Sequence, residues 1–328
     1  MRLKDMLEDS GTTDQVKKVL SGLPEDGKKA IDNFFDYTSA YNMHGSKDRF
    51  LEKLSFLPNE DRILYHYTTV DSVKAILKSR TWFIKQKGFM NDHKELFYTI
   101  ELVKTILTEL KATPDEINVF DKILKTTPIG DTYIWSFTEN KASQTLFGNY
   151  SVNSNGIALG LNSSQIEKEL FTHFSHGKDS SEFFTNGDAY SFALKVVYDE
   201  KIQRESLEPI VKEWMLAYRG LKAMPKDRKV ILTNCLTTIS FFALCFKNPL
   251  LRQEEEIRFV ITYNGEVNKN YSEKTIDGVP YVTCEVSDFL IREAIIQTGS
   301  SITVSRFKNE LREYGFGSIR VSESELPY

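Results

Sequence analysis

Apolar residues recur at helical spacing near the N-terminus, over residues 12–54. Short polar breaks separate the segments, and Pro24 stands where a helix can begin, because proline is accepted in the first helical turn. The apolar positions are Val16, Val19 and Leu20 in one segment and Ile31, Phe34 and Phe35 in the next. We therefore expect residues 1–60 to form an N-terminal helical extension.

From Arg62 onward, short apolar runs alternate with helical patterns. Strands are predicted at residues 63–67, 81–84, 133–138, 156–161, 192–198, 257–263, 279–286 and 318–321. Helices are predicted at residues 70–78, 92–110, 201–217, 230–246 and 304–314, the first of them capped by Thr69 or Asp71. This irregular order favours an α+β fold with a mixed or mainly antiparallel sheet, and residues 61–328 then form one domain.

The composition is typical of a soluble globular protein, with 41% hydrophobic and 27% charged residues among 328. Cys235, Cys245 and Cys284 have no CxxC spacing, and we interpret them as reduced core residues. The N-terminus lacks a signal-peptide stretch, and no window approaches the ~20 apolar residues that span a bilayer. We therefore place the protein in the cytoplasm, without a membrane partner.

The net charge of −4 gives no overall attraction to nucleic acid. An acidic protein can still carry a basic cleft, and residues 222–229, KAMPKDRK, are one basic stretch. A solvated loop is the favoured interpretation of this stretch.

Several polar residues of types suited to catalysis or ligand binding lie at the ends of predicted elements. His66, between Tyr65 and Thr68, lies at the end of the first strand, where it either meets a ligand or is satisfied by a backbone partner. Asn91 belongs to a run, residues 91–95, at a predicted helix start, where capping is the favoured role. Ser136 and Thr138 share one face of their predicted strand, as sugar-binding hydroxyls or as part of a half-exposed strand.

The sharpest cluster is RQEEEIRFV at residues 252–260. If these residues form a strand, Glu254, Glu256 and Arg258 share one face, and carboxylates so close would normally repel each other. A cleft that handles a cation explains the crowding, and a solvated strand edge explains it equally well.

Motifs for several other chemistries are absent from the sequence. There is no GxGxxG, GxxxxGK[ST], HExxH or GxSxG, so phosphate loops, zinc hydrolysis and serine-elbow hydrolysis have no support. His173 and His176 are two candidate metal ligands without a third, so a surface pair is the favoured interpretation and no metal is expected.

In this order the clusters resemble a bacterial family known as domain of unknown function 2971. The matching residues are 65–68, 91–95, 136–140, 147–150 with 156–160, 246–258 and 324–328, so the resemblance covers about residue 63 to the last residue. That family in turn is similar to the ADP-ribosyltransferase superfamily, including the DarT-type toxins that modify nucleic acids. In those enzymes an H-x-T motif lies on the first strand and an essential glutamate begins a later one.

The resemblance implies an ADP-ribosyltransferase-like catalytic domain, with a mixed, mainly antiparallel β core split around a cleft and surrounded by helices. It implies transfer of ADP-ribose from NAD to a macromolecule, RNA or DNA before protein, in a toxin or anti-phage effector with a possible antitoxin partner. An NAD glycohydrolase and a noncatalytic binding module are the alternatives.

The resemblance also assigns roles to residues. Glu256 would stabilise the oxocarbenium-like centre that forms when the bond between nicotinamide and ribose breaks, with Glu254 as a general base for the acceptor. The residues that would bind NAD are His66, Tyr67, Thr68, Asn91, Ser136, Tyr150 and Arg258. Among these, His66 would hold a ribose hydroxyl or the nicotinamide amide, Tyr150 would stack on nicotinamide, and Arg258 would orient the glutamate or meet a phosphate.

Overall fold

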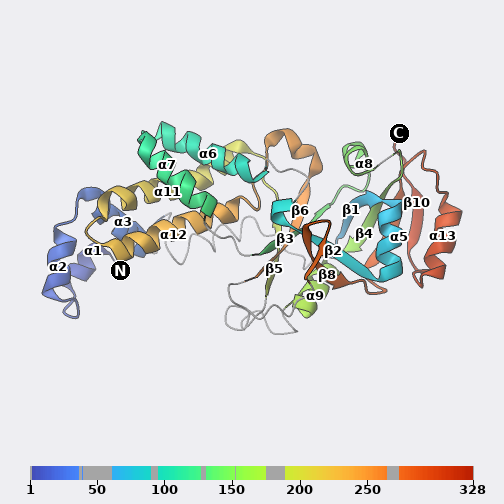
Figure 1. The fold of residues 1–328 in the computed structure, drawn as a ribbon, viewed down its shortest axis with the longest axis horizontal. Helices are drawn as coiled ribbons and strands as arrows, with labels where there is room; N and C mark the ends of the chain where they lie inside the picture. The colour runs from blue at the N-terminus through green and yellow to red at the C-terminus, as the bar shows by residue number, and fades with distance from the viewer. Residues whose placement is uncertain are drawn as a thin grey trace. The chain divides into compact units, whose positions relative to one another are not determined.

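The computed structural model describes residues 2–36, 39, 61–89, 95–126, 131–151, 153–174, 189–263 and 273–327. The helices are α1 (Leu3–Glu8), α2 (Asp14–Ser21), α3 (Glu25–Phe35), α5 (Val70–Ser79), α6 (Glu95–Glu109), α7 (Pro114–Thr126), α8 (Gln144–Tyr150), α9 (Ser163–Phe174), α11 (Glu200–Gly220), α12 (Pro225–Phe242) and α13 (Val304–Glu313), with 3-10 turns η1 (Lys87–Phe89) and η2 (Pro249–Glu254) (Figure 1). The strands are β1 (Ile63–Thr69), β2 (Thr81–Gln86), β3 (Thr132–Thr138), β4 (Gly156–Asn162), β5 (Ala189–Lys195), β6 (Glu256–Tyr263), β7 (Glu273–Ile276), β8 (Val279–Glu285), β9 (Ile291–Ile296) and β10 (Arg320–Glu323).

The chain has an α+β fold, as the sequence predicted. Every ladder among the described strands is antiparallel except the one between β9 and β10, which is parallel. Each strand and helix that the hydrophobic pattern predicted is present, with its ends moved by a few residues. The predicted helix over residues 92–110 is described only from Glu95, and the predicted helical residues 40–54 lie outside the described part of the chain.

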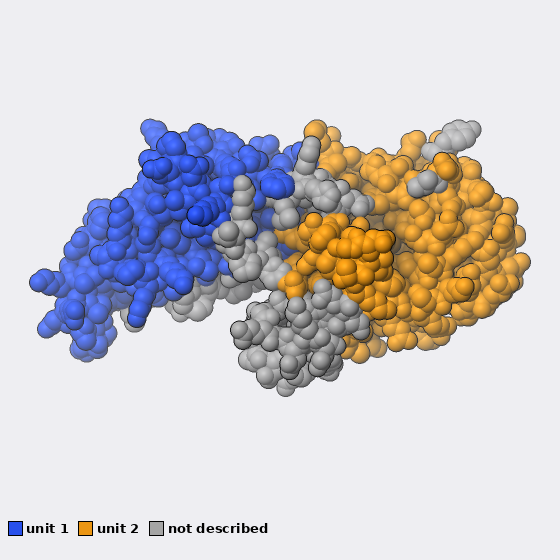
Figure 2. All heavy atoms as spheres, viewed as in Figure 1, with its two compact units in different colours: residues 1–54, 94–129, 197–249 blue, residues 55–93, 130–196, 250–328 orange. Residues whose placement is uncertain are grey.

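Two compact units make up the chain, and Figure 2 colours them separately. Unit 1 comprises residues 1–54, 94–129 and 197–249, and unit 2 comprises residues 55–93, 130–196 and 250–328. This division differs from the expected one at residue 60, because the N-terminal helices share a unit with α6, α7, α11 and α12. The physical reason is burial of apolar faces: α3 covers its own by packing on α11 instead of forming a separate extension.

Unit 1 is helical, and its tightest contact joins α3 to α11. A Cβ atom added to Gly27 would lie 2.5 Å from the backbone oxygen of Gly220, and one added to Gly220 would overlap the backbone of Gly27. The two helix backbones therefore touch at a position where only glycine fits on either side.

A buried carboxyl lies on α11 within unit 1. Glu213 is 1% exposed, Asn33 Nδ2 on α3 donates a hydrogen bond to its Oε2 at 2.8 Å, and its Oε1 has no hydrogen-bond partner among the described residues. Burial raises the pKa of Glu213 to about 8, and the bond from Asn33 opposes that rise. Glu213 is therefore mostly protonated at neutral pH.

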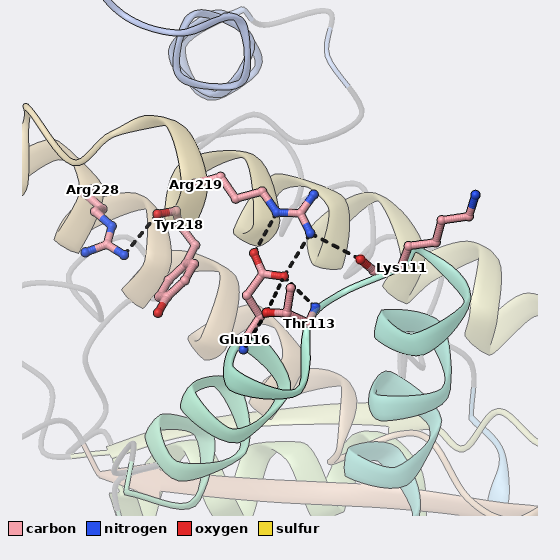
Figure 3. Close-up of polar contacts among 6 residues, drawn as sticks. All are labelled: Lys111, Thr113, Glu116, Tyr218, Arg219 and Arg228. Carbon is pink, nitrogen blue, oxygen red and sulfur yellow. Dashed lines mark hydrogen bonds and ion pairs between the residues drawn. The ribbon is translucent and has the colours of Figure 1, made fainter.

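An ion pair joins α7 to α11 in the same unit. Thr113 and Glu116 form a capping box at the start of α7, with Thr113 N donating to Glu116 Oε2 at 2.7 Å and Glu116 N donating to Thr113 Oγ1 at 3.3 Å. Arg219 donates Nε to Glu116 Oε1 at 2.6 Å and Nη2 to Oε2 at 2.9 Å (Figure 3). These bonds from Arg219 are the main reason that the pKa of Glu116 is lowered to about 2.

The basic stretch at residues 222–229 is only partly a loop, because α12 begins at Pro225. Arg228 in this stretch lies over the ring of Tyr218, 4.5 Å from its centroid, and donates to the Tyr218 backbone oxygen at 3.0 Å (Figure 3). The Tyr218 ring also stacks on Trp214, with centroids 4.9 Å apart. Both neighbours of this aromatic ring belong to unit 1.

Unit 2 contains the sheet, which divides at β3. One edge of β3 pairs with β6 along its whole length, from Thr132 to Thr138. The opposite edge pairs with two different strands, β2 at Tyr133 and Ile134 and β1 at Thr138 alone. Between these points no described strand bonds to that edge. We call this stretch of β3, residues 135–137, the β3 junction.

The two faces of the sheet bury different sets of side chains. On one face α5, α9 and α13 supply residues such as Val73, Leu170 and Phe307 to a large core with Trp135 and Phe259. On the other face α8 packs on β1 and β4, where Leu146 and Phe147 meet Tyr65 and Tyr67. We call these the core face and the α8 face.

No described helix is long and apolar enough to cross a bilayer. The three cysteines are buried and form no disulfide among the described residues, which agrees with their interpretation as core residues.

Candidate functional site

The three strands that carry the key sequence motifs are neighbours in the sheet. β1 holds the HYT motif, β3 holds Ser136, and β6 begins with Glu256. In the register Tyr65 lies opposite Thr138, and Thr138 lies opposite Glu256. Residues that are distant in sequence therefore meet within one row of the sheet.

Glu256 and Arg258 form a buried ion pair on β6. Arg258 Nη2 donates to Glu256 Oε2 at 2.8 Å, and the two side chains are only 1% and 7% exposed, respectively. Two residues apart on a strand, they leave the same face, which places the cation beside the carboxylate. An arginine so buried is stable only with a charged partner, so the pair fixes the position of the Glu256 carboxylate.

Glu254 and Glu255 precede the strand and do not belong to it. The strand begins at Glu256, so the expected face of Glu254, Glu256 and Arg258 does not form as one regular strand face. Glu254 ends η2 and is 8% exposed, whereas Glu255 is exposed and has a φ of 45°. The chain thus turns through a left-handed residue between the two buried acids.

Ser136 shares the face of the ion pair. It lies directly opposite Arg258 in the ladder between β3 and β6, and paired residues project to the same side of a sheet. Its Oγ is buried and has no hydrogen-bond partner among the described residues. A buried hydroxyl in this state can take a ligand group as its partner.

His66 lies at the β3 junction. Its Nδ1 is 2.9 Å from the backbone oxygen of Ser136, and since a carbonyl oxygen only accepts, Nδ1 carries the proton and Nε2 is the acceptor. The imidazole contacts Trp82 edge-on at 5.7 Å between centroids and lies 5.7 Å from Phe137. Burial lowers the pKa of His66, and the bond to Ser136 opposes this, so the ring is neutral at pH 7.

The register separates His66 from Glu256. Tyr65, Thr138 and Glu256 project from the α8 face, and His66, the residue after Tyr65, leaves β1 on the core face, where its aromatic contacts lie. The expected pairing of these two side chains across one cleft is thus not seen in the register. What connects them is β3, which bonds to the imidazole at Ser136 and faces Glu256 at Thr138.

The Tyr67 hydroxyl makes two hydrogen bonds to the segment between β3 and α8. Its hydroxyl donates to the Asn140 backbone oxygen at 2.7 Å and accepts from Ser143 N at 3.0 Å. The ring contacts Phe147 with centroids 4.9 Å apart, and burial raises the pKa of the phenol to about 12. Tyr67 therefore holds the segment between β3 and α8 in place.

The remaining predicted residues fall in different places. Thr68 lies beside Ile157 of β4 and leaves β1 on the same face as His66. Tyr150 ends α8 and packs on the α8-face cluster. Asn91 lies outside the described residues, so its predicted role stays a prediction.

Comparison with known proteins finds one family. Residues 146–259 match the family described as Protein of unknown function (DUF2971). The sequence of this segment is thus similar to that family. The match is shorter than the resemblance expected from residue 63 to the end, and no curated protein or solved structure matches the chain significantly.

The DUF2971 match contains the acidic end of the site. It includes Tyr150, Glu254, Glu256 and Arg258, and it ends within β6. His66 and Ser136 lie before it, so their link to the acids rests on the sheet register and not on the family match.

Sequence reasoning missed Trp82 as a neighbour of His66. Trp82 is 2% exposed, and its Nε1 has no hydrogen-bond partner among the described residues. The sequence did place Trp82 in the short strand predicted after the helix at residues 70–78. It did not show that β2 would pair with the same edge of β3 as β1.

Across the described residues, no group of three or more His, Cys, Asp or Glu side chains could hold a metal ion.

Proposed function

We propose that this protein is an ADP-ribosyltransferase-like enzyme that uses NAD as a substrate, with Glu256 as its catalytic carboxylate. One observation carries the proposal: the H-x-T motif, Ser136 and Glu256, far apart in sequence, lie on the adjacent strands β1, β3 and β6. The resemblance to ADP-ribosyltransferases implies an H-x-T motif on the first strand and a glutamate at the start of a later strand, and β1 and β6 carry these residues at those places.

The ion pair with Arg258 supports a catalytic role for Glu256. When nicotinamide leaves, its bond to ribose C1′ breaks and positive charge develops on the sugar. A carboxylate fixed before the reaction stabilises that charge without rearranging, and the ion pair with Arg258 supplies this fixation. The acceptor then bonds to C1′ and gives up a proton, for which Glu254 is the nearest buried acid in sequence.

Ser136 and Arg258 complete the polar side of the proposed pocket. The buried Ser136 hydroxyl, which has no hydrogen-bond partner in the described part of the chain, would bond to a ribose hydroxyl or an amide group of NAD. Arg258 has the guanidinium geometry that also suits a phosphate. The role that the resemblance assigns to His66 would need its imidazole on the α8 face, whereas the register places it on the core face, with Nδ1 held by the Ser136 backbone oxygen.

The proposal extends to the acceptor and the cell. We favour RNA or DNA over protein as the acceptor of ADP-ribose. The protein would act in the cytoplasm as a toxin or anti-phage effector, and an antitoxin would inhibit it. These features are what the sequence resemblance to DarT-type enzymes implies, and the proposed transfer uses no metal.

Labelled NAD provides the test. The purified protein is incubated with NAD labelled in the adenylate moiety, in the presence of cellular RNA, DNA or protein, and the products are separated. Label on a macromolecule supports transfer, whereas free ADP-ribose alone supports an NAD glycohydrolase. Mass spectrometry after brief expression then identifies the modified atom.

Glu256→Gln is the decisive variant, because it keeps the shape and removes the charge. We expect at least a hundredfold loss of NAD turnover, in the range found when one stabilising group of a transition state is removed. Glu325→Gln, at an exposed position near the C-terminus, is the matched control and should behave as wild type.

A noncatalytic binding module is the second candidate, and the register favours it. His66 is satisfied by a backbone oxygen, and it leaves the sheet on the face opposite to Glu256. If wild type and Glu256→Gln are alike in NAD turnover and in toxicity on expression, this second function replaces the first.

A further inference from the structure

The buried acids Glu254 and Glu256 are separated by one exposed residue whose backbone is left-handed. Glu255 has a φ of 45°, which lies in the left-handed region of the backbone. This region costs free energy for every residue except glycine, and few other residues adopt it. The Glu255 side chain is exposed, and its backbone N donates to the Arg252 oxygen at 3.2 Å, closing the last turn of η2.

The strain has a consequence for the site. Glu255 is the single residue between the end of η2 at Glu254 and the start of β6 at Glu256. Both flanking acids are buried, whereas the Glu255 side chain is exposed to solvent. The start of β6 is also held by Val196 N, which donates to the Glu256 backbone oxygen at 3.0 Å. Such strain persists where the surrounding structure fixes it, and it is common at functional sites.

We propose that Glu255 is a positioning residue whose left-handed backbone, and not its carboxylate, sets the direction of the Glu256 side chain toward Arg258. This inference rests on the proposed function only for its effect on turnover. The structural part concerns the ion pair and can be measured whether or not the protein consumes NAD.

Three substitutions separate backbone from charge. Glu255→Gly relieves the strain and keeps the turn, Glu255→Val disfavours a positive φ because its β-carbon is branched, and Glu255→Gln keeps the size and removes the charge. We expect Glu255→Gly and Glu255→Gln to turn over NAD within about threefold of wild type. Glu255→Val should lower kcat by at least tenfold while KM for NAD changes less than threefold.

The ion pair supplies the second measurement. The side-chain Nε–H signal of Arg258, assigned with Arg258→Lys by 15N NMR, should be unchanged in the Gly and Gln variants and moved in Glu255→Val, with the remaining spectrum of unit 2 preserved. An unmoved Arg258 signal in Glu255→Val overturns the inference, as does equal loss of kcat in all three variants.

The two proposals can fail separately. Wild-type protein that turns over no NAD, together with a moved Arg258 signal in Glu255→Val, removes the enzymatic function and leaves Glu255 as the residue that positions the acid pair. NAD turnover that survives in Glu255→Val with an unmoved signal removes the role of Glu255 alone.

Discussion

Three buried glutamates in this protein have different partners. Glu256 is buried with a cation beside it, Glu116 is buried under Arg219, and Glu213 is buried with an amide as its partner. The bonds from Arg219 favour the ionised form of Glu116, whereas burial favours the protonated form of Glu213. The environment, and not the residue type, thus decides the charge state of these two glutamates.

Glu213 should make the stability of unit 1 depend on pH. Its pKa is about 8 in the folded state and 4.5 as the ordinary value, so between these pH values the folded state holds a proton that the unfolded state has lost. The free energy of unfolding of unit 1 is therefore highest below about pH 4.5. It falls by roughly 1.4 kcal/mol per pH unit between about pH 4.5 and about pH 8, and it levels off above the folded pKa.

Glu213→Gln tests this expectation. The amide keeps the size and cannot ionise, so we expect a higher urea midpoint than wild type at pH 8 and little difference at pH 4.5. Urea unfolding of both proteins across pH 4.5–8.5 measures the effect, with Glu205→Gln, at an exposed position of the same helix, as the control. Parallel pH profiles for wild type and Glu213→Gln would contradict the assignment of a protonated buried acid.

The chemistry of single residues was only partly predictable from sequence. The crowding of Glu254, Glu256 and Arg258 was visible, and two of the three form the ion pair. The opposite directions of His66 and Glu256 were not visible, because a side chain's face depends on which residue of the next strand lies opposite. The left-handed Glu255 was hidden as well, since glutamate gives no signal for a positive φ.

At the scale of elements, the helices and strands with clear periodicity were predicted well. Thr69 caps α5 as expected, with its Oγ1 accepting from Ser72 N at 3.1 Å. The missed elements include α7, α8, α9, β7 and β9. Some of these are short, such as β7 at Glu273–Ile276, and others, such as β9, are recognisable only beside their sheet partners.

The contact between α3 and α11 predicts a large effect from one methyl group. Gly220→Ala should destabilise unit 1 by about 2–3 kcal/mol, because the added Cβ would overlap the backbone of Gly27 and the helices cannot approach as closely. Gly148→Ala is the control, since a Cβ there meets no atom within 4 Å and alanine suits a helix better than glycine.

Urea unfolding measures both glycine variants. An equal urea midpoint for Gly220→Ala and wild type would show that the two helices can move apart without loss of stability. That result would contradict the importance of the close approach between Gly27 and Gly220.

At the scale of the whole molecule, each unit has its own buried core, and the three tryptophans report on them separately. Trp214 lies in unit 1, while Trp82 and Trp135 lie in unit 2. We expect urea unfolding followed by tryptophan fluorescence to show two transitions, as is common for chains with separate cores.

Trp214→Phe assigns the transitions, because it should remove the fluorescence change of unit 1 and leave that of unit 2. The substitution Gly220→Ala should then shift only the transition that Trp214 reports. One transition shared by all probes, and shifted as a whole by Gly220→Ala, would mean that the units unfold together.

Unit 1 is assembled from three stretches of the chain, with pieces of unit 2 between them. As the polypeptide leaves the ribosome, α3 must wait for α11, which is synthesised only after β1 to β5. The first helices are thus exposed for most of translation, with an uncovered apolar surface that a chaperone could hold. For the same reason, cutting the gene after the N-terminal helices would strip α11 of its cover and yield an insoluble fragment in place of a minimal domain.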